Sequence, residues 1–356
     1  MLLESLQRKG IDGEILRWLK SWLTNRTMQT RVKGDLSTKK ITKSSVPQGS
    51  GLSPILFAIF LDDIVKEISE DTEAVFYADD IRLYRTAKTL EDWSTLQRDL
   101  DIMDKWNDEH SMLFSPAKCE IITYGRPAKD DEPGLFMKGV RLAEKSTIKD
   151  LGVWTDDDMK YRTHFDTVVS RIRSTAVRLK TLRPTRKAKI LNLIWDALVV
   201  SRILHGANVW NVQKSKDLSR LVQAQASFFS GVEYKKGDKI APFITQTLIK
   251  LDMVMYWKML NDKTPLDKRE FFNAHNGEWL VDTRLSREED RTLRVDSNVR
   301  MQLNRNRDFT RRRIDMWNKF PPKIRTGSEY TLKTFLKEEY EVTKTCLLYT
   351  SPSPRD

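Results

Sequence analysis

The sequence predicts an α+β fold over residues 1–155 and a helical continuation over the rest of the chain. Up to Trp154, short runs rich in aromatic and β-branched residues alternate with segments whose apolar residues recur at helical spacing. From Asp156 onward, only the helical spacing remains. Hydrophobic residues make up 39% of the 356 residues, which is typical of a globular protein long enough to form two domains.

The charge balance favours a polyanionic partner. Lys and Arg outnumber Asp and Glu by 62 to 50, giving a net charge of +12 at pH 7. This excess favours nucleic acid, and a basic protein without such a partner is the alternative.

The cysteines and the apolar runs restrict the cellular context. Cys119 and Cys346 are too few for a disulfide framework or a Cys/His zinc cluster, and they indicate a reducing compartment. The longest apolar run, residues 55–61, is too short to span a bilayer, and the charged first segment does not resemble a signal peptide. We therefore expect an intracellular protein, in the nucleus or the cytoplasm, with no membrane segment.

Two helices are predicted at the start of the chain. The leucines within residues 2–6 fit one helical turn, and Asp12 is placed as the N-cap of a second helix. Helical spacing puts Ile15, Leu19 and Trp22 on one face of that second helix.

Two strands and a glycine-containing loop follow. Alternating residues predict strands over 28–32 and 39–46, separated by a Gly-Asp-Leu-Ser turn. Residues 46–54 then read Val-Pro-Gln-Gly-Ser-Gly-Leu-Ser-Pro, in which Ser53 can cap a helix and Pro54 fits its first position. The glycines would let the backbone approach a ligand closely, although a plain structural turn explains this loop equally well.

The helix after this loop continues with apolar residues at helical spacing as far as Ile64. Its acidic pair, Asp62 and Asp63, is interpreted as a solvated polar face.

An acidic hairpin is the most informative stretch of the sequence. Residues 74–77 and 81–84 are predicted strands, and Ala78-Asp79-Asp80 joins them where a tight turn normally uses Asn-Gly or Asp-Gly. A local rule broken at one place indicates a functional site. Adjacent carboxylates repel each other unless they share a cation, and hard oxygen ligands suit Mg²⁺. The hairpin therefore predicts a metal site for phosphoryl chemistry.

The remaining elements follow from periodicity. We predict helices over 93–106, 165–179, 190–198 and 218–229, a loop over 112–118, and strands over 120–124 and 148–154, the last broken by Gly152.

Two basic runs lie in the second half of the chain. Residues 171–189 hold eight Lys and Arg residues and no acid, and residues 300–325 hold nine against Asp308 and Asp315. Contact with a phosphate backbone and an ordinary solvated face are the two interpretations.

In their order and spacing, these motifs resemble the reverse transcriptases of non-LTR (LINE-type) retrotransposons. The resemblance is strongest in Val46-Pro47-Gln48-Gly49-Ser50 with Leu52-Ser53-Pro54, and in Tyr77-Ala78-Asp79-Asp80. Further similar segments are Leu113–Lys118, Lys149–Val153, Ile203–Gly206 with Val209-Trp210, and Trp317–Pro321.

The resemblance implies RNA-templated DNA synthesis with two Mg²⁺ ions, an RNA template, a DNA primer and deoxynucleoside triphosphates. By this resemblance, Asp79 is a direct metal ligand and Asp80 has a supporting role. Lys118 is a candidate proton donor to pyrophosphate, and a surface lysine is the alternative. The substrate-binding residues that it implies are Pro47, Gln48 and Gly49 at the template base and incoming nucleotide, Tyr77 and Ala78 at the primer end, and Leu151 and Gly152 at the primer backbone.

The family also implies a domain division. Residues 1–155 correspond to part of a right-hand polymerase palm, an antiparallel sheet with packed helices. A helical thumb over 156–265 and a basic region over 266–345 follow, and residues 346–356 are expected to be a non-native or disordered tail.

One departure from the family bears on activity. In the family, a strand carrying the first catalytic aspartate lies before the segment that residues 1–11 resemble. We therefore expect a fragment that lacks one of three metal-holding carboxylates and is inactive by itself. A non-catalytic nucleic-acid-binding remnant of a decayed or domesticated element is the alternative. An intron-encoded or RNA-templated RNA polymerase is a weaker one, against which the Pro-Gln-Gly loop argues.

Overall fold

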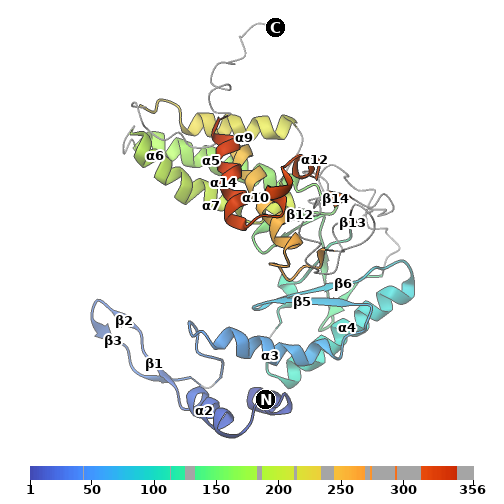
Figure 1. The fold of residues 1–356 in the computed structure, drawn as a ribbon. Helices are drawn as coiled ribbons and strands as arrows, with labels where there is room; N and C mark the ends of the chain where they lie inside the picture. Colours follow the sequence, from blue (N-terminus) through green and yellow to red (C-terminus); the bar gives the residue numbers. More distant parts are fainter. Residues whose placement is uncertain are drawn as a thin grey trace. The chain divides into compact units, whose positions relative to one another are not determined.

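The computed structural model describes the chain in two compact units (Figure 1). Unit 1 comprises Met1–Ile121 and Ala128–Glu144, and unit 2 comprises Ile122–Pro127 and Lys145–Asp356. The described residues are 1–42, 44–112, 114–124, 133–182, 187–211, 215–233, 244–268, 273–274, 293–294 and 314–342.

Three helices share a small core at the start of unit 1: α1 (Leu2–Arg8), α2 (Gly13–Leu23) and α3 (Ser53–Val65). The two predicted first helices are confirmed. Asp12 occupies the N-cap position of α2, although its side chain makes no capping hydrogen bond. The predicted face of α2 is wrong at Ile15, which is 63% exposed, because Leu16 and Leu19 are the residues that contact the core.

The acidic pair at the end of α3 joins two helices. Asp63 accepts hydrogen bonds from Ser5 Oγ at 2.7 Å and Arg8 Nη2 at 2.8 Å, and Lys9 pairs with both Asp62 and Asp63. Although burial opposes it, the hydrogen bonds from Ser5, Arg8 and Lys9 hold the pKa of Asp63 well below its usual range. The interpretation of this pair as a solvated face holds for Asp62, whose side chain is 56% exposed, and is wrong for Asp63, which ties α3 to α1.

An extended hairpin arm occupies residues 27–41. Its outer strands, β1 (Thr27–Met28) and β4 (Lys40–Ile41), pair with each other, as do β2 (Arg31–Val32) and β3 (Asp35–Leu36). The turn lies at Lys33 and Gly34, one residue earlier than the sequence predicted, because both residues have positive φ as a type I′ turn requires.

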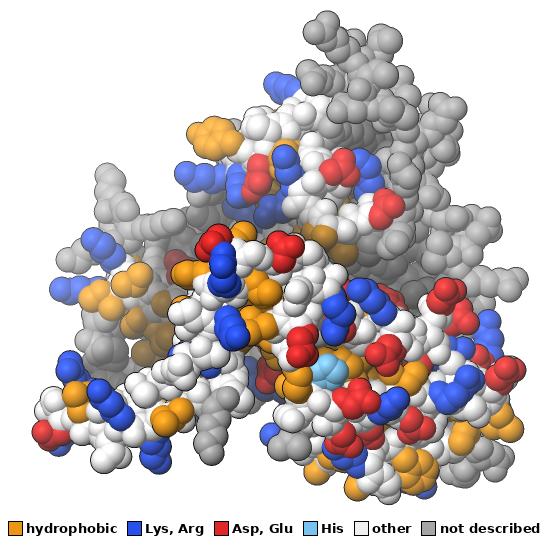
Figure 2. Space-filling model, turned by 90° about the horizontal axis from the view of Figure 1, so that it is seen from below, with side chains coloured by type: hydrophobic (Ala, Val, Ile, Leu, Met, Phe, Trp, Pro, Cys, Tyr) orange, Lys and Arg blue, Asp and Glu red, His pale blue; other side chains and the backbone are white. Residues whose placement is uncertain are grey.

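Charged side chains of both signs and hydrophobic side chains are interspersed on the face of the protein drawn in Figure 2.

A second layer of unit 1 consists of a β-hairpin packed on helices. β5 (Glu73–Tyr77) and β6 (Asp80–Tyr84) pair antiparallel, and α4 spans Leu90–Glu109. Both predicted strands and the predicted helix are confirmed. A capping box at Thr89 and Asp92 starts α4. The core between these elements contains Leu61, Ile64, Ile68, Met103 and Trp106, with Ala74, Phe76, Ile81 and Leu83 of the hairpin packed against it.

The rest of unit 1 is built from short elements: η1 (Pro116–Lys118), β7 (Glu120–Ile121), β8 (Phe136–Met137), β9 (Val140–Arg141) and β10 (Ala143–Glu144). The predicted strand over 120–124 is thus shorter than expected, and it pairs parallel with β10. The α+β class is confirmed in its mixed composition. The described strands form two-stranded sheets only, so the continuous antiparallel sheet we expected is not present among the residues that the structure describes.

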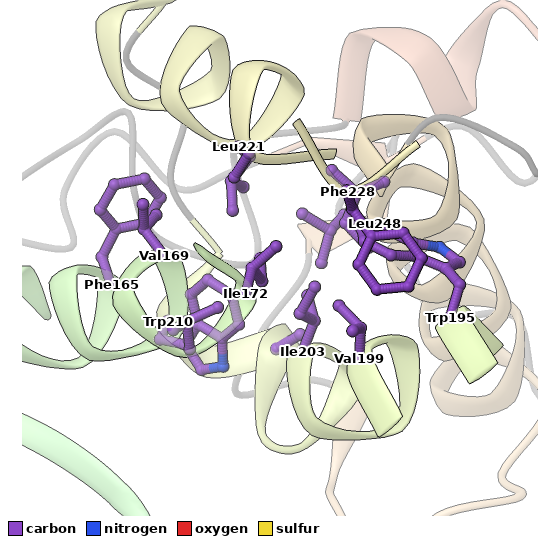
Figure 3. Close-up of a cluster of buried hydrophobic side chains, with 14 of the residues drawn as sticks. Phe165, Val169, Ile172, Trp195, Val199, Ile203, Trp210, Leu221, Phe228 and Leu248 are labelled. Atoms are coloured by element: carbon purple, nitrogen blue, oxygen red, sulfur yellow. The ribbon is translucent and has the colours of Figure 1, made fainter. Parts of the chain in front are cut away.

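Unit 2 begins with a hairpin and continues as helices. β11 (Thr147–Asp150) pairs antiparallel with β12 (Val153–Asp156), so the strand predicted over 148–154 is two strands that turn at Leu151 and Gly152. The helices that follow are α5 (Arg162–Leu182), α6 (Ala188–Ile194), the π-helical turn η2 (Trp195–Val200), α7 (Ser201–Leu204), α8 (Ala207–Trp210), α9 (Ser215–Phe228) and α10 (Ile244–Leu260). Figure 3 shows apolar side chains from these helices, Trp195, Trp210 and Phe228 among them, meeting in one core.

A second core in unit 2 joins α10 to three later helices: α12 (Ile314–Asn318), α13 (Pro322–Arg325) and α14 (Glu329–Val342). A two-stranded pair, β13 (Asn273–Ala274) and β14 (Leu293–Arg294), is also described. Residues 300–313 of the second basic run and the tail at 346–356 lie outside the described residues. None of the helices in the described ranges has the length and apolar character needed to cross a bilayer.

Candidate functional site

The hairpin of β5 and β6 exposes its turn. Tyr77 pairs with Asp80 as the last rung of the ladder, so the turn consists of Ala78 and Asp79. Phe76 faces the core between α3 and α4, whereas the next residue, Tyr77, is 64% exposed. Packing therefore holds the strands while residues 77–80 stay accessible.

The backbone of this turn departs from what its side chains prefer. Ala78 has a φ of +52°, whereas Asp79 does not lie in the positive-φ region. This is the φ pattern of a type II′ turn, whose first central residue is normally glycine. An L-residue there costs roughly 1–2 kcal/mol. The predicted conflict with turn chemistry is confirmed at Ala78, but Asp80 is the first residue of β6 and not part of the turn.

The two carboxylates differ in their surroundings. Asp80 Oδ2 lies 4.0 Å from Arg82 Nη2, a long ion pair along β6. Asp79 has no hydrogen-bond or ion-pair partner among the described residues, so its carboxylate oxygens remain available to a ligand. Adjacent acids with one uncompensated member suit a hard divalent cation.

The residues present fit only part of such a cation site. Within the described ranges, no group of three or more His, Cys, Asp or Glu side chains is arranged to hold a metal ion. Asp79 and Asp80 could therefore supply two carboxylates, and a further ligand would have to come from elsewhere.

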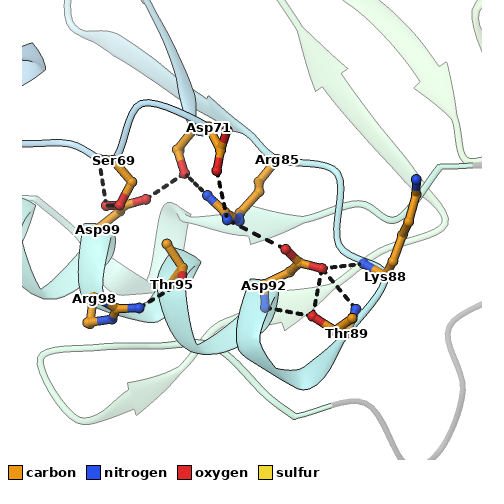
Figure 4. A network of polar contacts seen from close by, with 10 residues as sticks. Ser69, Asp71, Arg85, Lys88, Thr89, Asp92, Thr95, Arg98 and Asp99 are labelled. Carbon is orange, nitrogen blue, oxygen red and sulfur yellow. Dashed lines mark hydrogen bonds and ion pairs between the residues drawn. The ribbon is translucent and has the colours of Figure 1, made fainter.

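A buried polar network holds the open end of the β5–β6 hairpin, opposite the turn at Ala78 and Asp79 (Figure 4). Asp99 on α4 is fully buried and accepts hydrogen bonds from Ser69 N at 3.0 Å, Ser69 Oγ at 2.7 Å and Thr72 Oγ1 at 2.6 Å. Arg85 Nη1 donates to Thr72 Oγ1 at 3.1 Å, and Arg85 Nη2 lies 3.5 Å from Asp92. Because Thr72 immediately precedes β5 and Arg85 immediately follows β6, both ends of the hairpin are anchored to α4.

Asp99 was not predicted from the sequence as a buried polar residue. An acid on an amphipathic helix is usually solvent-exposed, but Asp99 follows Leu96 by three residues and precedes Met103 by four. Its position on the apolar face of the helix could have predicted a buried carboxylate, and a buried carboxylate must be hydrogen-bonded.

The loop at residues 47–53 presents Gln48 on a turn. Ser50 N donates to Pro47 O at 3.4 Å and Gly49 has a φ of +86°, as at the third position of a type II turn. Gln48 and Gly49 are exposed. The predicted cap is wrong: Leu52 is the N-cap residue of α3, Ser50 Oγ accepts from Ser53 N at 3.1 Å, and Ser53 Oγ donates to Pro47 O at 2.5 Å.

Helix α3 connects this loop to the acidic hairpin. Near its start, Leu56 packs in a cluster that includes Val46 and Leu52 of the loop. Further along, Leu61 and Ile64 pack in the cluster that includes the hairpin. One helix therefore supports both predicted parts of the site, although no hydrogen bond joins Gln48 to Asp79 or Asp80 within the described residues.

The other predicted site residues lie apart in the chain. Lys118 is exposed at the end of η1, and Leu113, the first residue of its motif, lies outside the described residues. Leu151 and Gly152 belong to unit 2, where they form the β11–β12 turn with φ values of +43° and +88°. Both values are positive, as in a type I′ turn.

Comparison with known proteins shows which family residues 2–155 match. Residues 2–155 match the family described as reverse transcriptase (RNA-dependent DNA polymerase). The RNA-directed DNA polymerase from the mobile element jockey of Drosophila melanogaster is 26% identical over 218 residues, which are 58% of this chain and 24% of that protein. The probable RNA-directed DNA polymerase from transposon BS of the same fly is 24% identical over 217 residues, 57% of this chain and 24% of that protein.

A third relative is a polyprotein from a retrotransposable element. The retrovirus-related Pol polyprotein from the type-1 retrotransposable element R2 of Popillia japonica is 26% identical over 176 residues, 43% of this chain and 27% of that protein. The chain thus spans about a quarter of the length of these relatives. The resemblance carried by the Pro-Gln-Gly and Ala-Asp-Asp motifs is confirmed: residues 2–155 match the reverse transcriptase family, and the chain is similar to RNA-directed DNA polymerases of non-LTR mobile elements.

Proposed function

We propose that this chain contributes part of the palm and the thumb to an RNA-directed DNA polymerase that copies RNA from a DNA primer. The observation that carries the proposal is the exposed acidic pair Asp79 and Asp80 at the tip of the β5–β6 hairpin, which lies inside the family match; Asp79 has no ion-pair partner among the described residues. The named activity of the relatives supports it, and their greater length makes the activity of the whole enzyme part of the proposal.

The residues at the tip of the β5–β6 hairpin have distinct roles in this proposal. Asp79 would bind a divalent cation directly. Asp80, which forms a long ion pair with Arg82, would have a supporting role in holding the cation. Bound Mg²⁺ ions would supply activation of the primer 3′-hydroxyl and charge compensation on the leaving pyrophosphate. Tyr77 and Ala78, exposed beside the carboxylates, would contact the primer end.

The remaining predicted contacts are assigned to exposed turns. Pro47, Gln48 and Gly49 form the turn that would border the template base and the incoming nucleotide. Leu151 and Gly152 would contact the primer backbone. Lys118, exposed and without an ion-pair partner among the described residues, would give a proton to pyrophosphate.

Helix α5 offers a surface for the phosphate backbone. Arg171, Arg173 and Arg178 are exposed on it and have no acidic partner within the described residues, whereas Arg220 of α9 is paired with Asp166 at 2.8 Å. Unpaired guanidinium groups along one helix suit a polyanion, because each phosphate contact releases a counterion.

Polymerase activity is tested with the open reading frame that contains this chain, on an RNA template with a DNA primer. Asp79→Asn is expected to lower Mg²⁺-dependent incorporation by at least about 10²-fold, the size typical of losing one electrostatic stabiliser. The matched control is Asp101→Asn, an exposed carboxylate on α4, which should keep normal activity. Equal activity of the two variants would refute the assigned ligand.

A non-catalytic nucleic-acid-binding remnant is the second candidate function. The absence of a third metal-binding side chain beside Asp79 and Asp80, within the described residues, favours it. Binding of Mn²⁺ separates the two candidates without any need for turnover. The polymerase proposal expects Asp79→Asn to weaken Mn²⁺ binding at least about tenfold, since losing an outer-shell partner alone typically costs 10- to 100-fold. Unchanged Mn²⁺ binding together with tight RNA–DNA binding would favour the remnant.

A further inference from the structure

A histidine outside the family match bonds to the turn between β11 and β12. His205 lies between α7 and α8, beyond residue 155, where the match ends. Its Nε2 is 2.7 Å from the carbonyl oxygen of Leu151, which can only accept, so Nε2 carries the hydrogen. Leu151 and Gly152 are exposed, and this bond reaches the tip of the hairpin from a segment more than fifty residues away.

Two glycines let the backbones approach closely enough for this bond. A Cβ on Gly152 would lie 2.9 Å from His205 Nε2, and a Cβ on Gly206 would lie 2.6 Å from Val153 Cγ2. Both glycines also have positive φ, which any L-residue would adopt only with strain. The His205-Gly206 pair is therefore shaped to the Gly152-Val153 side of the turn.

A series of contacts that begins and ends at the β11–β12 hairpin holds His205 in place. The His205 carbonyl accepts from Trp210 Nε1 at 2.9 Å, and the buried Trp210 ring packs edge-to-face on His164 at 5.0 Å between centroids. His164 Nδ1 in turn accepts from Trp154 N of β12 at 3.2 Å. His205 thus bonds to the tip of the hairpin and His164 bonds to its second strand. Both histidines also contact Trp210.

We propose that His205 is a positioning residue that fixes the Leu151–Gly152 turn for contact with the primer strand. The inference rests on the proposed function for the role of the turn, while the contact that it invokes belongs to unit 2 alone. Without the His205 bond, the tip would keep its type I′ turn and the packing of Val153 in the helical core, but it would lose its hydrogen bond to the segment between α7 and α8. Primer would then be bound by a turn of variable position.

Binding of a labelled RNA–DNA primer–template to the full chain tests the proposal. His205→Ala is expected to weaken binding about three- to tenfold, the effect of losing one hydrogen bond. His205→Gln, whose amide can donate to the same carbonyl, should recover most of that loss. Val209→Ala, an exposed change on α8, is the matched control and should bind normally. Amide hydrogen exchange at residues 151–153 should rise in His205→Ala and not in His205→Gln.

The outcomes separate this inference from the proposed function. If His205→Ala binds primer–template as tightly as Val209→Ala does, or if Gln and Ala behave alike, His205 is not a positioning residue. In an active open reading frame, His205→Ala should raise the KM for primer–template and leave kcat within about twofold, and a fall in kcat alone would also overturn the inference. If the unmutated protein incorporates no nucleotides but His205→Ala still weakens primer–template binding, only the polymerase proposal is refuted.

Discussion

At the scale of one residue, Ala78 has a backbone conformation that is unfavourable for its side chain. The acidic hairpin holds alanine at a φ of +52°, where glycine would be unstrained. Ala78→Gly relieves strain of roughly 1–2 kcal/mol but adds about 0.4–1 kcal/mol of chain entropy to the unfolded state. We therefore expect Ala78→Gly to leave the free energy of unfolding unchanged or raise it by up to about 1.6 kcal/mol, measured by urea denaturation.

The control for Ala78→Gly is the same substitution at a helical site. Ala58 is exposed in α3, where glycine should lower the free energy of unfolding by about 1 kcal/mol. If both variants lose the same stability, Ala78 is not strained. The sequence could predict this conflict because Ala-Asp-Asp is a poor turn, but the exact turn residues depended on the ladder register, which pairs Tyr77 with Asp80.

His164 provides a pH dependence at the same scale. Burial first, and then Arg171 and His205, lower the pKa of His164 from 6.5 to about 4. The unfolded chain therefore takes up a proton near pH 6.5, and the folded chain does so only near pH 4. Stability linked to His164 is complete above pH 6.5 and decreases as the pH falls toward 4, by up to about 3 kcal/mol.

The measurement is the free energy of unfolding of the protein between pH 7 and pH 4. His164→Asn keeps an acceptor near the Nδ1 position and cannot titrate, so its profile should be flatter than that of the unmutated protein by up to the same amount. An equally steep profile in His164→Asn would assign the pH dependence to other groups.

At the scale of elements, the hairpin depends on the network centred on Asp99. This buried carboxylate accepts three hydrogen bonds from Ser69 and Thr72. Asp99→Asn places an amide among donors and removes the charge, so we expect a loss of about 2–4 kcal/mol in the free energy of unfolding. Asp101→Asn, two residues away and exposed, should change it by less than about 0.5 kcal/mol. A loss below 1 kcal/mol in Asp99→Asn would show that the network contributes little.

Elements with a repeated pattern were predictable from the sequence, and those set by pairing partners were not. Helix α4 followed from Trp93, Leu96 and Met103, because period and burial coincide. The break predicted at Gly152 in the strand over 148–154 is confirmed, but it is a full turn at Leu151 and Gly152 between two paired strands, and the pairing was not predicted. Partners more than fifty residues away, such as His205 and Leu151, leave no periodic signal.

For the whole molecule, the net charge of +12 predicted a polyanionic partner but not the surface that binds it. Within the first basic run, Arg171, Arg173 and Arg178 of α5 are exposed and have no acidic partner among the described residues. The run at 300–325 is described only from residue 314 onward, where Arg325 is buried and donates to Asn318 O at 2.8 Å. A basic run in sequence is therefore not by itself a binding surface.

The salt dependence of nucleic-acid binding measures how many of these arginines contact phosphate. Each contact contributes a slope of about −0.9 to log Kobs against log salt, so Arg171→Gln, Arg173→Gln and Arg178→Gln combined should make the slope shallower by about 2–3. Arg220→Gln is the matched control, because Arg220 already pairs with Asp166 and lies over the Phe165 ring. It should leave the slope unchanged. If the triple variant keeps the full slope, the phosphates are bound elsewhere on the chain, and α5 only carries a solvated basic face.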